Sequence, residues 1–306
     1  MWFLFLEVTN VVIIFGKNKV SRFTSDEKRL IFNQAYLEAL ELYPKPTRIH
    51  DIKTSFGVVR IYEYLPKEKT RNKPIVFFHG HYASSLMWTP NIESFLNEAP
   101  LYSIDFIDEP GLSRQRRPFR SHKDEALYLE EVFKQIRVKK FHLLGVSLGG
   151  WKAVNYTHYY PNRVASLILL DPVSVFSPLS KEIVFRYLGS LFKEHNMVEY
   201  LLNGQELPQE NPFSKTINMA MNDFEFGTAF PLGTRKNALK SLKSPVLALM
   251  AGKSPLHDSN LAVKNGRKWV KTIEIENWKD ATHGFSFELA EEVNKKIKLF
   301  LSRIEE

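Results

Sequence analysis

The sequence predicts an α/β fold in which helices cover both faces of a mostly parallel β-sheet. Short apolar runs of strand length alternate with amphipathic segments of helix length along most of the 306 residues, as parallel strands joined by crossover helices require. The alternation pauses once, between residues 172 and 244, and then resumes. Because this pause follows a strand, it predicts an insertion over the carboxyl edge of the sheet, where ligands bind in such folds.

The composition fits one large domain with an insertion, or two domains. Hydrophobic residues make up 44% of the chain and charged residues 25%, a balance that argues against disorder. There is no cysteine, which excludes disulfides, cysteine-ligated zinc and thiol catalysis and is compatible with the cytoplasm, where we expect the protein. The net charge is +8, but no stretch interleaves aromatic and basic residues as a nucleic-acid platform would, so we expect no nucleic-acid partner.

The elements follow from periodicity and from turn residues. Residues 24–43 are apolar at helical spacing and are followed by two prolines, and residues 49–65 predict two strands joined at a turn near Gly57. Further strands are expected at short apolar runs, at 74–80, 99–106, 141–146, 164–171, 245–252 and 271–278. Further helices are expected at 90–97, 124–138, 148–160, 258–269 and 286–304.

These elements divide the chain into three expected parts. Residues 1–45 form an N-terminal apolar segment and a helix, and residues 46–171 together with 245–306 form the α/β core. Residues 172–244 are mostly helix-like, with breaks at glycine and proline, and they form a helical cap insertion.

Two segments leave a contact with a membrane surface open. Residues 1–16 are apolar but include Glu7, and basic residues follow them rather than precede them, unlike a secretory signal. A span needs about 20 apolar residues, so we expect an extra strand or a surface-packed segment here, with weak membrane association through this segment as the alternative. The stretch 114–123 has five basic residues and no acidic one, which predicts a solvated loop or a contact with an anionic ligand or membrane.

Ser147 stands between the predicted strand 141–146 and the predicted helix 148–160. Reversing direction within one residue strains the backbone and exposes the serine at the carboxyl edge, while Gly145 and Gly149 relieve the crowding. The helix N-terminus directs free N–H groups at the site. The G-x-S-x-G pattern alone also occurs in ordinary loops, so this context is what predicts Ser147 as a nucleophile.

A serine hydroxyl needs a base, and histidine suits proton transfer near neutral pH. His283 follows the last predicted strand, so its loop reaches the same carboxyl edge, and Gly284 permits a tight turn there. His142 lies within a predicted strand and His158 within a predicted helix, where structural roles are expected. The sequence therefore favours His283.

The oxyanion of an acyl transfer needs N–H donors. Leu148 supplies one backbone N–H by its position directly after the nucleophile, and we expect the second from His81, in the loop after the strand 74–80. The imidazole of His81 is expected to line the pocket, and His79 to be structural.

With these residues the sequence resembles the α/β-hydrolase superfamily. The segments that carry the resemblance lie in the family's order within about residues 50–304: FFHGHYASSLMW, IDEPGLS, GVSLGG, LILLDP and ATHGFSFE. The finer resemblance is to small bacterial serine carboxylesterase-like hydrolases with a helical cap. It implies an α/β-hydrolase fold and serine hydrolase chemistry, with no cofactor and no metal.

The acid of the triad does not stand where the family usually has it. That place is just past the strand 245–252, but this chain continues with GKSPLHD, which has no carboxylate before Asp258. Asp171 ends a neighbouring strand 24 residues after Ser147, and some relatives carry their acid at the equivalent strand end. Asp171 could instead belong to a turn, and Asp258 could be a helix N-cap. Asp171 is favoured, with Asp258 or no acid as alternatives.

The expected reaction is hydrolysis of a carboxylic ester through an acyl-enzyme, with Ser147 as nucleophile, His283 as base and Asp171 as the orienting acid. The aromatic-rich insertion suits a small-molecule ester or acyl substrate that is partly apolar. A C–C bond hydrolase, a peptidase and an acyltransferase would use the same residues. A non-catalytic binding protein is the alternative from another class, because the position of the acid is irregular.

Overall fold

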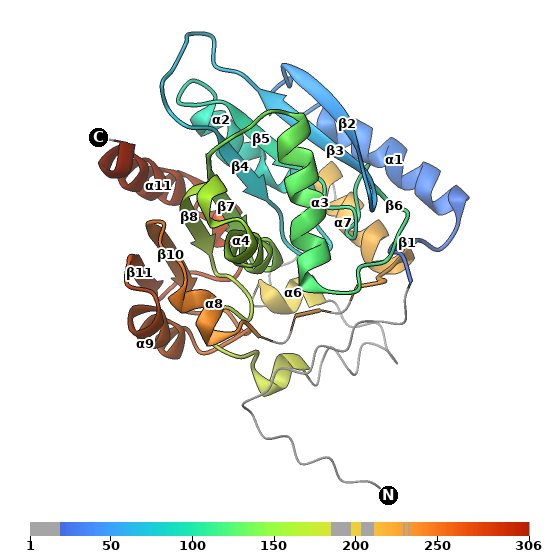
Figure 1. The fold of residues 1–306 in the computed structure, drawn as a ribbon. Helices are drawn as coiled ribbons and strands as arrows, with labels where there is room; N and C mark the ends of the chain where they lie inside the picture. The colour runs from blue at the N-terminus through green and yellow to red at the C-terminus, as the bar shows by residue number, and fades with distance from the viewer. Residues whose placement is uncertain (1–18, 185–196, 203–210, 229, 232, 306) are drawn as a thin grey trace, which may run out of the picture.

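The computed structural model describes residues 19–184, 197–202, 211–228, 230–231 and 233–305. Within these residues the predicted α/β fold is confirmed, because a nine-stranded, mostly parallel sheet carries helices on both faces (Figure 1). The N-terminal segment 1–16, for which we expected a strand or a surface-packed segment, lies outside the described residues. No helix in the described part of the chain is long and apolar enough to cross a membrane.

The strands of the main sheet have the bounds β2 Arg48–Thr54, β3 Gly57–Tyr64, β4 Ile75–Phe78, β5 Leu101–Ile104, β6 Arg114–Gln115, β7 Phe141–Val146, β8 Val164–Leu170, β10 Val246–Ala251 and β11 Ile273–Trp278. Their order is β11-β10-β8-β7-β4-β5-β3-β2, with β6 paired to β3. The pairs from β11 to β5 are parallel, whereas β3 is antiparallel to β2, β5 and β6. The parallel strands therefore end at one common edge, where the candidate site residues were expected.

The helices have the bounds α1 Asp26–Leu40, α2 Thr89–Phe95, α3 His122–Gln135, α4 Leu148–Tyr159, α6 Met197–Leu201, α7 Pro212–Asp223, α8 Lys236–Lys240, α9 Ser259–Trp269, α10 Phe285–Glu288 and α11 Ala290–Glu305. Two 3₁₀ turns, η1 Ser85–Trp88 and η2 Pro161–Arg163, precede α2 and β8. Helices α3, α4 and α9 pack on one face of the sheet, and α1, α2 and α11 pack on the other (Figure 1).

An apolar core fills the space on each side of the sheet. Alternate residues of β10 enter different cores, since Ala248 and Met250 face α4 and α9 whereas Leu247 and Leu249 face α11. This follows from the period of two residues in a strand. A strand that buries both faces is apolar throughout, which is why β4, β7, β8 and β10 were recognisable as short apolar runs.

Short polar side chains fix where several helices begin. Ser25 accepts a hydrogen bond from the backbone of Lys28 at the start of α1, and Ser121 accepts one from Asp124 at the start of α3. The helix ends differ by a few residues from those expected. The single helix expected at 286–304 is divided into α10 and α11 by Leu289, whose φ of −120° and ψ of 42° are not helical.

The insertion 172–244, which we expected to be mostly helical with breaks, contains helices and also a short strand. It contains the two-residue strand β9 (Phe224–Glu225), which pairs antiparallel with β1 (Arg22–Phe23). Next to this pair, α7 packs against α1, and the backbone N–H of Thr24 donates to the carbonyl of Asp223 at 2.8 Å. The segment before the core and the insertion are therefore joined, although about two hundred residues separate them.

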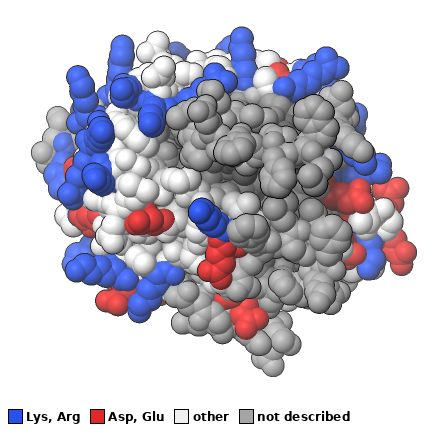
Figure 2. All heavy atoms as spheres, turned by 90° about the horizontal axis from the view of Figure 1, so that it is seen from below, with Lys and Arg blue, Asp and Glu red and all other residues white. Residues whose placement is uncertain are grey.

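Basic side chains are spread over the surface. Figure 2 shows Lys and Arg around much of the described rim of one face, with acidic side chains among them. In the basic stretch 114–123, Arg114 belongs to β6, a strand that we did not predict, and Arg117 lies 4.0 Å from the centre of the Phe56 ring. Both arginines are exposed, so the stretch is held by backbone pairing and ring contact while its charges face solvent.

Candidate active site

Ser147 forms the sharp turn between β7 and α4. Its φ of 52° and ψ of −119° lie in a region that residues other than glycine rarely adopt. A Cβ at Gly145 would lie 2.4 Å from the carbonyl oxygen of Gly149, and a Cβ at Gly149 would lie 2.2 Å from that of Phe78. Only glycine fits at these two positions, because the turn packs so closely on itself and on β4. The turn is tied to β8 by a 3.0 Å hydrogen bond from the Ser147 N–H to the Leu170 carbonyl.

Of the two candidate acids, Asp171 is the one that lies against His283. Asp171 directly follows β8 and is fully buried, at 0% exposed. His283, in the loop between β11 and α10, places its Nδ1 2.7 Å from Oδ2 of Asp171. Asp258 instead begins α9, where its carboxylate accepts a 2.9 Å hydrogen bond from the N–H of Leu261. This is the N-cap arrangement that was the alternative for Asp258.

A second histidine, absent from the sequence predictions, completes the surroundings of Asp171. His257 Nε2 lies 2.9 Å from Oδ1 of Asp171, and the backbone N–H of Ala251 donates to the same oxygen at 3.0 Å. His257 belongs to the segment GKSPLHD after β10, where the family pattern led us to expect a carboxylate. The sequence signal for this contact was the histidine itself. It stands where the family has its acid, and it is a partner for Asp171 at the end of the neighbouring strand β8.

The contacts around Asp171 shift the pKa values of Asp171 and His257. Burial alone would raise the pKa of Asp171, but the charges of His257 and His283 and the hydrogen bonds from them outweigh it and hold this pKa well below its usual value. Burial alone would lower the pKa of His257, but the facing carboxylate outweighs it and raises this pKa. An ionised Asp171 can only accept hydrogen bonds, so Nδ1 of His283 carries a proton, and Nε2 is the basic nitrogen of the neutral ring.

The loop after β4 lies against Ser147. A Cβ placed on Gly80 would be 3.6 Å from the Cβ of Ser147, so the backbone of this loop passes beside the serine. His81 follows Gly80, and Leu148 is the first residue of α4, whose leading N–H groups have no partner within the helix. His81 therefore directly follows a residue whose backbone lies beside Ser147, and Leu148 directly follows Ser147 itself. These are the two residues expected as oxyanion donors.

The two imidazoles of this loop have structural partners. His79 is fully buried, its Nε2 accepts a 3.1 Å hydrogen bond from the N–H of Phe106, and burial lowers its pKa. His81 Nδ1 lies 2.8 Å from Oε1 of Glu109. Its ring packs against Phe226 and Phe230 of the insertion, with centroids 4.4 and 5.2 Å away. The insertion therefore contacts the loop beside Ser147.

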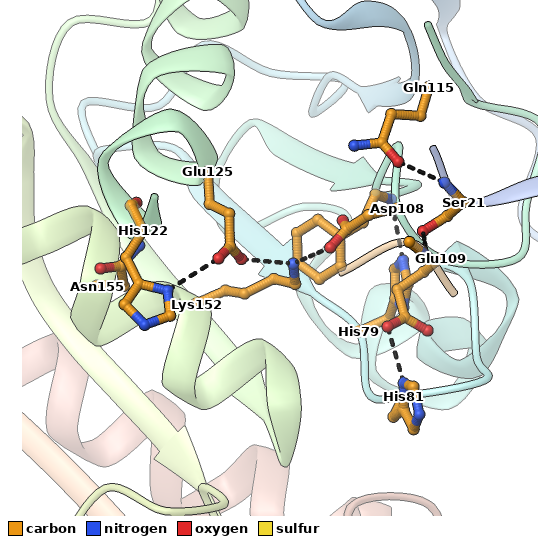
Figure 3. Close-up of polar contacts among 12 residues, drawn as sticks. Ser21, His79, His81, Asp108, Glu109, Gln115, His122, Glu125, Lys152 and Asn155 are labelled. Atoms are coloured by element: carbon orange, nitrogen blue, oxygen red, sulfur yellow. Dashed lines mark hydrogen bonds and ion pairs between the residues drawn. The ribbon is translucent and has the colours of Figure 1, made fainter. Parts of the chain in front are cut away.

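A buried charge cluster lies one helical turn beyond Leu148 (Figure 3). Lys152 Nζ is 2.7 Å from Oδ2 of Asp108 and 3.1 Å from Oε2 of Glu125, and no member of this trio is more than 3% exposed. Burial raises the pKa of Asp108 to about 6, against the opposing charge of Lys152. The sequence analysis did not predict this cluster, although a single lysine in the otherwise uncharged helix after the nucleophile was a signal for it.

Comparison with known proteins gives the family. A family model described as the alpha/beta hydrolase fold matches residues 73–280, more than half of the chain. The chain belongs to the α/β-hydrolase family. The fold class predicted from the sequence, and the resemblance that carried it, are therefore both confirmed.

This α/β-hydrolase is similar along most of its length to carboxylesterases of Bacillus subtilis. One of them, the uncharacterized carboxylesterase nap, is 28% identical over 281 residues that cover 89% of this chain and 92% of that protein. Carboxylesterase YbfK is 26% identical over 92% of this chain and 96% of its own length. The crystal structure of naproxen esterase has a TM-score of 0.81 and 28% identity, and covers 91% of this chain and 99% of that one. The prediction of a hydrolase that resembles bacterial carboxylesterases is confirmed.

In this α/β-hydrolase the candidate residues come from three strand ends. Ser147 follows β7, Asp171 follows β8, and His283 lies in the loop after β11. Among the described residues, no group of three or more His, Asp and Glu side chains could hold a metal ion. The arrangement offers a serine hydroxyl at the carboxyl edge of the sheet, an oriented imidazole and a fixed anion, which are the parts that acyl transfer to serine needs.

Proposed function

We propose that this protein is a carboxylesterase that uses Ser147, His283 and Asp171 as a catalytic triad. The observation that carries the proposal is the 2.7 Å hydrogen bond between His283 Nδ1 and Asp171 Oδ2, at the same sheet edge as the strained Ser147 turn. The similarity to carboxylesterases over most of the chain supports an ester as the bond that is cleaved.

In the first half of the proposed reaction, Ser147 Oγ attacks the carbonyl carbon of the ester while Nε2 of His283 accepts the hydroxyl proton. The carbonyl oxygen becomes an oxyanion, which accepts hydrogen bonds from the backbone N–H groups of His81 and Leu148. The bond to the alkoxy group then breaks as His283 returns the proton to the leaving alcohol. An acyl group stays bound to Ser147.

In the second half, a water molecule attacks the acyl-serine and His283 accepts a proton from the water. The tetrahedral intermediate collapses, Ser147 Oγ leaves and regains a proton from His283, and the carboxylic acid departs. Asp171 keeps Nδ1 of His283 protonated and stabilises the imidazolium in both halves. Its depressed pKa supports this role, because the carboxylate stays ionised throughout the neutral pH range.

We also propose that residues 172–244 act as a cap that forms part of the substrate site. The contacts of Phe226 and Phe230 with His81 support this, because they place apolar rings of the insertion beside a proposed oxyanion donor. The substrate would then be a small-molecule ester that is partly apolar. The proposal includes a cytoplasmic location and no nucleic-acid partner or cofactor.

The rival activities differ in the bond cleaved or in the acyl acceptor. A C–C bond hydrolase, a peptidase and an acyltransferase would use the same triad, and the similarity to carboxylesterases favours ester hydrolysis over them. A non-catalytic binding protein was an alternative because the acid does not stand at the family's usual position just past β10. The contact between Asp171 and His283 supports a catalytic role over binding alone.

Labelling with a fluorophosphonate probe tests the nucleophile. We expect the wild-type protein to be labelled and Ser147→Ala to be unlabelled, because only an activated serine reacts with the probe. Ser55→Ala, at the exposed turn between β2 and β3, is the matched control and should be labelled like the wild type. Thermal unfolding of each variant shows whether it is folded. A folded wild-type protein that takes up no probe would contradict the proposed function.

A further inference from the structure

A small cavity lies beside the two proposed oxyanion donors. Its volume is about 10 Å³, and its wall includes His81, Leu148, Asp108, Lys152 and Thr228. A space of this size holds one non-hydrogen atom with its hydrogens, such as a water molecule or the end of a substrate chain. Leu148 and Lys152 are four residues apart on α4 and therefore face the cavity from the same side of the helix.

Three polar atoms of residues in this wall have no hydrogen-bond partner within the described part of the chain. They are Oδ1 of Asp108, Nε2 of His81 and Oγ1 of Thr228. Asp108 is only 2% exposed, so its free oxygen cannot turn toward bulk water. Buried polar atoms in native proteins nearly always have a partner. Residues of the cavity wall therefore carry buried polar atoms that can pair with a group supplied from outside the chain.

The chemistry of the three atoms favours a group that donates several hydrogen bonds. Oδ1 of Asp108 accepts whenever the carboxyl is ionised, which a pKa of about 6 allows at neutral pH. His81 directs Nδ1 at Glu109, so Nε2 of the neutral ring is an acceptor. The hydroxyl of Thr228 can also accept. A primary ammonium group donates three hydrogen bonds from a single nitrogen, whereas a substrate hydroxyl donates only one.

The charges around the cavity favour the same group. Glu109 and Glu125 also belong to the wall, so three carboxylates surround one lysine, and Lys152 already pairs with Asp108 and Glu125 (Figure 3). A carboxylate or phosphate on the substrate would be repelled by this excess of negative charge. A cation of one non-hydrogen atom would be attracted.

The place of the cavity shows which part of an ester would enter it. Of the residues proposed for catalysis, its described wall contains His81 and Leu148 but not Ser147, His283 or Asp171. His283 is the group that would hand its proton to the leaving alcohol, so a cavity on the oxyanion side belongs to the acyl part of the substrate.

We propose that this cavity is an acyl subsite for a primary ammonium group, and that the preferred substrates are esters of short amino acids. The inference rests on the proposed esterase function. Under this proposal the acyl part of the substrate is not purely apolar, because it carries a cation within a few bonds of the reacting carbonyl.

Matched esters test the subsite. One set consists of the phenyl esters of butanoic, 3-hydroxypropanoic and 3-aminopropanoic acid, in which a methyl, a hydroxyl or an ammonium group ends a chain of the same length. The second set, from propanoic, glycolic and amino-acetic acid, is one carbon shorter. The measured quantity is the ratio of kcat/KM for the ammonium ester to that for the methyl ester. Comparing this ratio between variants cancels the intrinsic reactivity of each ester.

Three variants separate the subsite from general packing. We expect Asp108→Asn to lower the ammonium-to-methyl ratio about 10- to 100-fold, as the loss of a hydrogen bond to a charged group does, and Thr228→Val to lower it roughly three- to tenfold. Thr234→Val removes the same hydroxyl group from a threonine of the insertion outside the cavity wall, and it should leave the ratio unchanged. Thr228→Val keeps the test open if Asp108→Asn fails to fold.

Binding of propylammonium provides a measurement that does not need turnover. In an NMR titration we expect it to bind the Ser147→Ala protein more tightly than propanol does, and Asp108→Asn to weaken this binding by a similar factor. If the wild type hydrolyses the esters but the ratio is the same in every variant, the subsite is wrong and the cavity holds only water. Variant effects confined to the hydroxyl esters would overturn the ammonium assignment. Intact propylammonium binding without hydrolysis or probe labelling would refute the esterase function alone.

Discussion

Two buried carboxylates of this protein, Asp171 and Asp108, have opposite pKa shifts although both are almost fully removed from water. Asp171 accepts hydrogen bonds from His283, His257 and the backbone of Ala251, and its pKa lies well below the usual value. Asp108 shares Lys152 with a second carboxylate, and one of its oxygens has no hydrogen-bond partner among the residues that the structure describes. Burial raises the pKa of Asp108 to about 6.

The comparison shows that donors, rather than burial alone, decide what a buried carboxylate can do. With donors on both oxygens, Asp171 is a permanent anion that can orient a base and stabilise its charged form. Asp108 has one oxygen without a hydrogen-bond partner among the described residues, so this oxygen can still accept a hydrogen bond from a ligand. Asp108 and Asp171 lie on either side of Ser147, both in the sequence and in the sheet. The proposed nucleophile would therefore have on one side a carboxylate with donors on both oxygens, and on the other a carboxylate with an oxygen that the described part of the chain leaves unpaired.

Removing the charge of Asp171 should have the largest effect. We expect Asp171→Asn to lower kcat by about 10³- to 10⁴-fold, because the amide no longer holds His283 in the productive tautomer. Asp258→Asn is the matched control and should leave turnover nearly unchanged, since asparagine caps a helix as well as aspartate does. Steady-state kinetics on a short-chain phenyl ester checks both. The reverse pattern would move the acid of the triad to Asp258.

Removing one donor from Asp171 should have a smaller effect and would sharpen the comparison. His257→Leu leaves Oδ1 with the Ala251 N–H alone, and we expect kcat to fall about 10- to 100-fold with little change in KM. His257→Gln keeps an N–H near the position of Nε2 and should recover most of the loss. This pattern would make His257 a positioning residue that acts through Asp171. An equal loss in both variants, or a rise in KM instead, would assign it to packing.

The pH dependence of stability should have opposite directions at the two carboxylates. Asp171 has a lowered pKa, so its stabilisation is present above pH 4 and is lost as the pH falls below that. Asp108 has a pKa raised to about 6, so between about pH 4 and pH 6 the unfolded chain gives up this proton while the folded protein keeps it. The free energy of unfolding of the wild type should therefore fall by about 2 kcal/mol relative to Asp108→Asn over this interval.

Urea denaturation of the wild type, Asp108→Asn and Asp171→Asn at pH 4, 5, 6 and 7 measures this difference. If the wild type and Asp108→Asn change in parallel across the interval, the carboxyl of Asp108 is not held in its acidic form by burial. The contrast with Asp171 would then rest on geometry alone.

Much of the fold was predictable because its signals are local. The apolar runs of β4, β7, β8 and β10 are buried on both faces and therefore show no polar alternation. The glycines around Ser147 report a turn too tight for a Cβ, and the position of His283 after the last strand follows from element order. By contrast, β1, β6 and β9 are two residues long each and have no pattern of their own.

The sequence by itself determined which predicted strand each candidate site residue follows. It placed a serine after one strand, a histidine in the loop after another, and two candidate acids. Only the tertiary structure shows which candidate acid lies beside His283, because β8 lies beside β10 in the sheet and brings Asp171 to both His257 and His283. It also decided that Lys152 is buried between Asp108 and Glu125 rather than exposed on its helix. The physical reason is the same in both cases. The hydrogen-bond partners of a buried charge come from elements far apart in the chain, and they approach one another only when the sheet and helices pack.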